Sequence, residues 1–377
     1  MTRCSHPTGA GVFAALGSLL IHGSLLATTA IPVTVSAGVP QKTAASETYT
    51  VRVDTTRLPT RIAFGSCSHQ DRDQPILDIV LEQEPDLFIY LGDNIYGDSR
   101  VLDTLAAKYG RLEAKPEFQR LRDGTTLLAT WDDHDYGEND AGRHYPLKDE
   151  SKDLFLDFWG EPAGTERRTS PGIYTSYLFE EGGKRLHVIL LDTRTFRDDL
   201  LRNDRVAPHK NDYRPNSSPD STLLGDAQWA WLEEQLRVPA DVRIIASSIQ
   251  FGHEYNGWES WTNVPHERER LLELVRRTGA SGVLFISGDV HWGEISRLEA
   301  DGLYPIYDVT SSGLTEEWPT TEPNRNRVGD IVRDNNFGLI EIHWSAVDPV
   351  VILQLIDEHG SVRNTVRLKL SELEDSE

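Results

Sequence analysis

Short runs of β-branched, aromatic and leucine residues recur along the first three quarters of the chain, and stretches with helical periodicity separate them. Runs of this kind are typical of strands that are buried on both faces of a sheet. Strand followed by helix, repeated, predicts a layered α/β fold rather than a helical bundle or an all-β barrel. The expected strands are residues 61–66, 87–91, 126–131, 186–191, 244–249 and 283–287, and the expected helices are residues 74–84, 102–109, 148–159, 227–236 and 267–278.

The last part of the chain has a different pattern, because its apolar runs follow one another with no helical stretch between them. We therefore expect part of the sheet to be antiparallel. Long loops rich in Pro, Asn and Asp interrupt the elements, and loops of this length are often functional. The four late strands are residues 304–310, 337–343, 350–356 and 362–368, and the long loops are residues 137–145, 197–221 and 315–336. We expect one domain over residues 59–377, preceded by a polar lead-in at residues 38–58.

Residues 1–37 have the composition of a secretory signal peptide. A basic start precedes an apolar, small-residue run, and Val35-Ser36-Ala37 suits a signal peptidase, with Ala30 as a second candidate site. An uncleaved anchor is the less favoured alternative, because His22 interrupts the run and a span needs roughly 18 uninterrupted apolar residues. We expect a secreted, periplasmic or extracellular protein with no stable membrane span after cleavage.

Cysteine content and charge narrow the picture further. Cleavage would remove Cys4 and leave Cys67 alone, so no internal disulfide can form, and Cys67 is either an inert buried thiol or a reactive or metal-binding one. The chain of 377 residues has 60 Asp and Glu against 38 Lys and Arg, a net charge of -22. This charge repels phosphate backbones unless a metal intervenes, which argues against a protein that coats nucleic acid.

Polar side chains with metal-binding capacity follow four of the expected strands. In open α/β sheets ligands gather beyond the carboxyl ends of the strands, so these clusters can converge on one crevice. Each cluster alone could instead form a turn or a helix N-cap, but four of them at four strand ends favour a cation site. The clusters are Cys67, then Gly92-Asp93-Asn94-Ile95-Tyr96, then Asp132-Asp133-His134-Asp135, and finally Gly288-Asp289-Val290-His291.

These clusters, in this order, resemble the metallophosphatase domain of the PhoD-like (alkaline phosphatase D) family, a branch of the calcineurin-like metallophosphoesterases. The resemblance runs from about residue 61 to residue 345. It implies two mixed β-sheets in a sandwich flanked by helices (α-β-β-α) and a secreted hydrolase with a di- or tri-metal centre. The segments that carry it are Phe64-Gly65-Ser66-Cys67, the Asp93 and Asp289 clusters, and Trp131-Asp132-Asp133-His134-Asp135.

The resemblance also implies roles for individual residues. Cys67 and Tyr96 would bind Fe(III), and Asp93 would bridge to Ca(II) or another divalent cation. Asp289 and His291 match the last metal-binding motif of the family. Either Asp132 or Asp133 would be a ligand, and His134 a ligand or a proton donor.

The sequence departs from the wider superfamily at two positions. The first motif is usually Asp-x-His, whereas here Cys67 is followed by Ser68 and His69. A further metal-binding histidine is expected after residues 244–249, and the sequence leaves Gln250 and His253 as alternatives.

The expected reaction is hydrolysis of a phosphate monoester or diester by a hydroxide that bridges two cations, with Asp93 and His134 as catalytic residues and His134 or His291 as proton donor. Trp258 and Trp261 would form a wall for an apolar or aromatic leaving group. Arg268 would contact phosphate oxygens, although a surface salt bridge is an alternative use for it.

Other functions remain possible on the residues alone. A phospholipase D-like or teichoic-acid-type diester hydrolase fits the same resemblance. A non-catalytic calcium-binding module is disfavoured, because calcium sites use oxygen ligands and give a thiolate no purpose. The sequence does not predict the natural substrate or the oligomeric state.

Overall fold

The computed structural model describes residues 49–204, 211–255 and 257–374, and two large mixed sheets organise them. The six-stranded sheet A has the order β15-β14-β13-β1-β2-β3, and the seven-stranded sheet B has the order β12-β10-β11-β9-β8-β5-β4. Sheet A contains β1 (Arg61–Gly65), β2 (Leu87–Leu91), β3 (Thr126–Thr130), β13 (Asn336–His343), β14 (Val350–Asp357) and β15 (Val362–Lys369). Sheet B contains β4 (Thr175–Glu181), β5 (Lys184–Leu190), β8 (Val242–Ala246), β9 (Val283–Ser287), β10 (Gly293–Leu298), β11 (Ile306–Ser311) and β12 (Arg327–Val332).

Both sheets are mixed: the parallel strands form one end of sheet A and the centre of sheet B. In sheet A, β1, β2 and β3 run parallel, and in sheet B, β5, β8, β9 and β11 do. The remaining large strands pair antiparallel with their neighbours, and β6 (Leu201–Arg202) with β7 (Tyr213–Arg214) forms a separate small ribbon. This arrangement confirms the predicted α/β class and the antiparallel character of the last strands. It also places the carboxyl ends of the parallel strands within reach of one another.

The helices cover the sheets, and the pleat of β2 shows how. Ile89 belongs to a core cluster shared by both sheets, whereas Phe88 and Tyr90 point to a second cluster formed with helices. Burial on both faces explains why β2 is apolar without alternation. The helices are α1 (Ile76–Glu82), α2 (Leu102–Glu113), α3 (Pro116–Gly124), α4 (Asp133–Tyr136), α5 (Lys148–Phe158), α6 (Glu166–Thr169), α7 (Gly225–Leu236) and α8 (Pro265–Thr278), with 3-10 turns η1 (Trp261–Asn263) and η2 (Leu370–Leu373).

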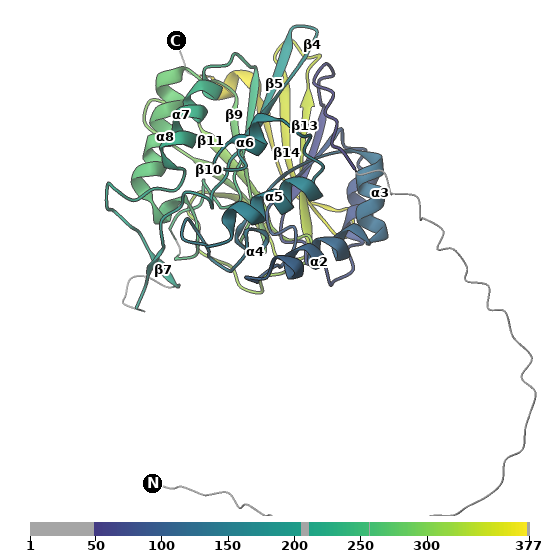
Figure 1. Ribbon diagram of the computed structural model, residues 1–377. Coiled ribbons are helices and arrows are strands. Elements are labelled where there is room, and N and C mark those ends of the chain that lie inside the picture. Colours follow the sequence, from purple (N-terminus) through teal and green to yellow (C-terminus); the bar gives the residue numbers. More distant parts are fainter. Residues whose placement is uncertain (1–48, 205–210, 256, 375–377) are drawn as a thin grey trace, which may run out of the picture. The chain divides into compact units, whose positions relative to one another are not determined.

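The two helical groups pack in different places. Phe118 of α3 and Phe155 of α5 lie in the cluster on the outer face of sheet A. Trp229 of α7 and Leu271 of α8 belong to the shared core with strands of sheet B. Figure 1 shows α7 and α8 side by side next to β9 and β11. The observed layers are therefore helix, sheet, sheet, helix, as the family resemblance implies.

Several elements differ from the expected ones. The sequence did not predict β4, β10, β12 or α3, and β12 lies inside the expected loop 315–336. β4 and β12 are edge strands with partly exposed residues, so they lack the continuous apolar run that marks a central strand. The predicted signal peptide lies outside the described residues. Among the residues that are described, no helix is long and apolar enough to cross a bilayer.

His187 of β5 gives the fold a predictable response to acid. Its side chain is 1% exposed, and burial, followed by the neighbouring Arg243 on β8, lowers its pKa from 6.5 to about 4. The unfolded chain binds the proton more readily than the folded chain between these values, so stability is lost as the pH falls from 6.5 to 4. His187→Leu should remove up to about 3 kcal/mol of this loss. Urea unfolding of both proteins at pH 7 and pH 4.5 measures the difference, and an equal loss in both would contradict the assignment.

Candidate metal centre

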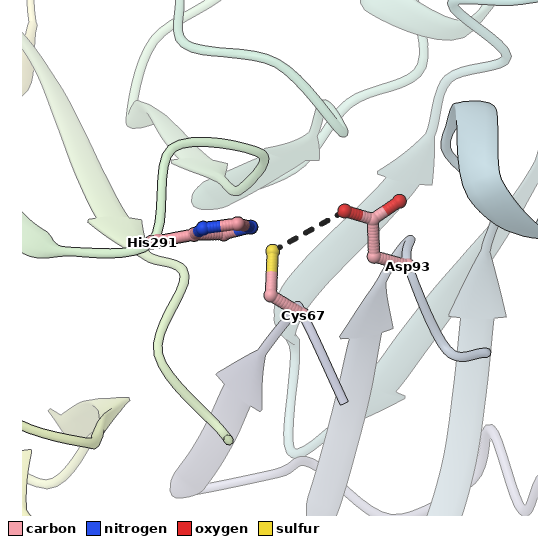
Figure 2. Close-up of side chains that lie close together, drawn as sticks. All are labelled: Cys67, Asp93 and His291. Carbon is pink, nitrogen blue, oxygen red and sulfur yellow. Dashed lines mark hydrogen bonds between the residues drawn. The ribbon is translucent and has the colours of Figure 1, made fainter. Parts of the chain in front are cut away.

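Three of the predicted ligands meet where β1, β2 and β9 end. Cys67 Sγ lies 3.4 Å from Asp93 Oδ2, and the ligand atoms of Cys67, Asp93 and His291 all lie within 4.8 Å of one another (Figure 2). Ser312, which follows β11, contacts Cys67 Sγ at 3.0 Å through its hydroxyl, and this hydroxyl also accepts the backbone N–H of His291 at 2.8 Å. A sulfur, a carboxylate and an imidazole therefore converge on one point.

Two further groups extend this point into a continuous set of ligands. Asp93, Asp133 and His134 form one group, and Asp132, Asp133 and Asp289 form another, each with ligand atoms within 4.8 Å of one another. Asp93 and Asp133 each belong to two groups. The structure thus brings together the carboxylate, imidazole and thiolate ligands that the sequence predicted at four separate strand ends.

Glycines of the motifs allow the strand ends to approach so closely. A Cβ on Gly92 would lie 2.5 Å from Asp132 Cβ, and one on Gly288 would lie 2.3 Å from Ser66 Oγ. Both distances are shorter than any real contact, and Gly92 also has a φ of 102°. The glycine before each motif aspartate is therefore required by the packing of one strand end on another.

The backbone at the ligands is strained. Cys67, Asp93, Asp289 and His291 have φ values of 61°, 50°, 77° and 65°. Non-glycine residues rarely adopt this left-handed conformation, and such strain clusters at functional sites. The fold holds these side chains at a cost in stability, which is expected where their position serves a function.

Several buried carboxylate oxygens at the site have no hydrogen-bond partner. They are Asp93 Oδ1, Asp132 Oδ2 and Asp133 Oδ1, and each of the three residues is at most 3% exposed. An unpaired buried carboxylate oxygen is costly, and a cation is the partner that satisfies it. The donor set and these free oxygens fit bound metal ions.

Burial and mutual repulsion disfavour the charged forms of Asp93, Asp289 and Cys67. Burial, then the neighbouring Cys67, raises the pKa of Asp93 well above its usual value, and burial, then Asp132, does the same for Asp289. Burial also raises the pKa of the Cys67 thiol to about 12. Metal ions would reverse these shifts, because a cation in contact stabilises carboxylate and thiolate.

The pKa values of His134 and His291 shift in opposite directions. Burial opposes a charge on His134, but Asp133, Asp93 and Asp98 outweigh burial and raise its pKa to about 11. Burial, together with the nearby His134, lowers the pKa of His291 to about 4. His291 is therefore neutral, which is the form that binds a metal.

Tyr96 is held in an aromatic stack beside the ligands. Its ring lies between His69, at 4.8 Å and 16° between planes, and His134, at 4.3 Å and 36°. Its hydroxyl is 3.1 Å from His291 Nε2. His69, at the departure from the Asp-x-His motif, belongs to none of the ligand groups among the described residues and packs against Tyr96 instead.

The structure separates the alternatives that the sequence left open at Asp132 and Asp133. Asp132 Oδ1 accepts hydrogen bonds from Arg194 Nε and Ser248 Oγ, both at 2.6 Å. Asp133 lines the cavity of the site and has its Oδ1 free. Asp133 thus presents a free oxygen at the cavity, whereas Asp132 has only its Oδ2 without a hydrogen-bond partner.

Gln250 and His253 both contact the buried Glu294 of β10. Gln250 Nε2 donates to Glu294 Oε1 at 2.9 Å, and His253 Nε2 lies 3.4 Å from the same oxygen. His253 belongs to no ligand group found among the described residues.

A cavity of about 290 Å³ opens above the ligands. Trp258 and Trp318 line it and pack edge to face, with ring centroids 5.4 Å apart and planes at 84°. Tyr213, Asp140 and Glu259 also line it. The sequence did not single out these last three, and the only signal for two of them was their place in long polar loops.

The structure does not bring Trp261 or Arg268 to this cavity. Trp261 is 0% exposed, and its indole N–H donates to Ser247 Oγ at 3.0 Å. Arg268 lines a different cavity, where its Nε donates to the carbonyl oxygen of Phe251 at 2.9 Å. Both residues support the loop that carries Trp258.

Known proteins are similar to this chain in sequence or in fold. The chain is 24% identical over 297 residues to alkaline phosphatase D of Bacillus subtilis (strain 168). The aligned region covers 67% of this chain and 48% of that protein. It therefore spans about half the length of this curated relative. The match to a solved structure of PhoD covers 85% of this chain and 73% of the PhoD chain, with 17% identity and a TM-score of 0.62.

A second solved structure, of GAP50, the anchor in the inner membrane complex of Plasmodium, has 14% identity and a TM-score of 0.52, and covers 83% of this chain and 89% of its own. At these identities the two structures bear on the fold alone. The sequence profile of PhoD-like phosphatases matches residues 62–330, a stretch that contains every predicted metal ligand. The match extends over well more than half of the sequence, and the chain belongs to the PhoD-like phosphatase family.

Proposed function

We propose that this protein is a metal-dependent hydrolase of phosphate monoesters or diesters. The observation that carries the proposal is the convergence of four strand ends on a cavity whose floor has free, buried carboxylate oxygens. An acidic protein can accept an anionic ester at such a floor once cations occupy it. Membership in the PhoD-like phosphatase family supports the phosphoric ester as the bond that is broken.

The ligand roles follow from which atoms are available. Cys67, Asp93 and His291 would hold one cation, with Tyr96 beside them, and Asp133 and Asp289, with Asp132, would hold another. Asp93 also forms a group with Asp133, which belongs to the second set, so Asp93 would lie between the two cations. Bound cations would supply Lewis acidity, which neutralises charge on the phosphoryl group and acidifies water.

His134 is placed to handle a proton. Its Nδ1 lies 2.7 Å from Asp98 Oδ1, and His134 lines the cavity, so Nε2 is the ring nitrogen left for a bound ester. A carboxylate on the far nitrogen fixes the ring and its tautomer. We assign to His134 the donation of a proton to the departing alcohol oxygen.

The ligand chemistry suggests two kinds of cation. Thiolate and phenolate are donors for a strongly Lewis-acidic ion such as Fe(III), and the group with Cys67 and Tyr96 fits it. The all-carboxylate group with Asp133 and Asp289 fits Ca(II) or another divalent cation. On the substrate side, Trp258, paired with Trp318, forms a wall against which an apolar or aromatic part of the ester can pack.

We also propose that residues 1–37 direct export and are then removed. The support is their composition, a basic start and an apolar run before Val35-Ser36-Ala37. N-terminal sequencing of exported protein should therefore show Gly38 as the first residue. A start at Ile31 would move the cleavage to Ala30, and an intact Met1 on extracellular protein would contradict removal.

Asp93→Asn and Asp289→Asn should each abolish most hydrolysis while the protein stays folded. Asparagine keeps the size and tolerates the left-handed backbone of both positions, but it removes a charged ligand. Loss of a residue that hydrogen-bonds to a metal ligand already lowers metal affinity or activity about 10 to 100-fold. Loss of the ligand itself should therefore lower kcat/KM at least about 100-fold.

The measurement is turnover of chromogenic phosphate mono- and diesters, with circular dichroism as the check on folding. Asp78→Asn is the matched control, because Asp78 lies on the surface of α1 and pairs there with Arg120 of α3. This variant should keep wild-type turnover. A folded Asp93→Asn protein with near-wild-type activity would contradict the assignment.

A further inference from the structure

A buried ion-pair network lies beneath the carboxylates of the metal centre. Arg194 Nη1 lies 2.8 Å from Glu259 Oε2, and Arg197 Nε lies 3.0 Å from Glu259 Oε1. All three side chains are at most 2% exposed. One carboxylate thus bridges two guanidinium groups with almost no access to water, where removal of one partner leaves a costly unpaired charge.

Both arginines also reach the site. Arg194 donates to Asp132 Oδ1 through Nε at 2.6 Å, and its Nη2 contacts the same oxygen and lies 4.0 Å from Asp133 Oδ1. Arg197 Nη2 donates to the carbonyl oxygen of Asp140 at 2.5 Å, and the N–H of Asp140 donates to Asp133 Oδ2 at 2.6 Å. The network therefore touches the Asp132-Asp133 pair from two sides.

Arg194 is a potential competitor of a metal ion. A guanidinium group and a cation bind the same carboxylate oxygens, and Asp133 Oδ1 is one of the oxygens that a cation requires. Glu259 holds one arm of Arg194 and leaves its other donors on Asp132. Without this anchor, the guanidinium is free to move the short distance to Asp133.

We propose that Glu259 is a positioning residue that acts through Arg194 and keeps the guanidinium group off Asp133, so that Asp133 remains open to a cation. The inference rests on the proposed metal-dependent function. Glu259 also follows Trp258 directly in the chain and lines the same cavity. It therefore connects the loop that carries Trp258 with the carboxylates of the metal centre. The role belongs to a residue that no motif of the sequence indicates.

The test measures Mn²⁺ binding to chelator-treated full-length protein. Binding is monitored through the EPR signal of the Mn²⁺ that stays free in solution. Glu259→Gln keeps the size of the side chain and removes its charge, and it should weaken Mn²⁺ binding about tenfold or more. Glu254→Gln is the matched control, since it removes an equal charge from the same loop, where Glu254 pairs with the exposed Arg325. The control should bind Mn²⁺ within about twofold of wild type.

A double-mutant cycle separates positioning from a structural role. In an Arg194→Gln background, Glu259→Gln should cause little further change in the Mn²⁺ dissociation constant, because the group that it restrains is gone. A purely structural loss would lower the unfolding midpoint and leave Mn²⁺ binding of the folded protein unchanged. Wild-type affinity in Glu259→Gln, or an undiminished effect in the Arg194→Gln background, would overturn the proposal.

Two further outcomes are distinguishable. If Glu259→Gln does not fold, Glu259→Asp replaces it, because a carboxylate one methylene shorter cannot reach both guanidinium groups. Weakened Mn²⁺ binding in Glu259→Asp then supports the proposal, and wild-type affinity overturns it. A wild-type protein that binds no Mn²⁺ would contradict the metal centre itself, whereas normal wild-type binding with an unaffected variant contradicts the role of Glu259 alone.

Discussion

Repulsion among buried carboxylates is the constraint on which this structure depends. The ligand atoms of Asp133 lie within 4.8 Å of those of Asp93 and of Asp289, and Asp93 and Asp133 are at most 3% exposed. Arg194 neutralises only part of this charge, through Asp132. The fold could hold such a cluster only at a large cost in free energy unless cations complete it, because buried charges need partners. The free oxygens and the strained backbone fit a site that is arranged to bind cations.

The sandwich supplies the rigidity that this arrangement needs. Backbone hydrogen bonds join the two sheets at the site, from Ser66 N–H in the loop after β1 to the carbonyl oxygen of Ser311 in β11, and from Leu314 N–H back to the carbonyl oxygen of Ser66. Ser312, between them, touches both Cys67 and His291. Ligands from sheet A and sheet B are therefore fixed by main-chain contacts rather than by side-chain packing alone. Sites on rigid elements hold their geometry better than sites on free loops.

The sequence predicted the parts of this structure that local chemistry determines. Strands buried on both faces, such as β2, are visible as continuous apolar runs, and a strand that ends in Gly-Asp marks where ligands gather. Features that depend on the path of a long loop were not predictable. Trp258 and Trp261 are three residues apart, yet one lines the cavity and the other is core, because the turn between them is set by tertiary contacts. Arg194 and Glu259 pair across 65 residues, a contact for which no local pattern exists.

The most direct test of the metal centre is elemental analysis of the full chain purified without chelators. The ligand set predicts iron together with a second cation such as calcium in each molecule. Iron bound by Cys67 and Tyr96 would give the protein a visible absorption band that Tyr96→Phe alters, since thiolate and phenolate donate charge to Fe(III). A protein that contains no bound metal and hydrolyses phosphate esters at its full rate in the presence of a chelator would contradict the account.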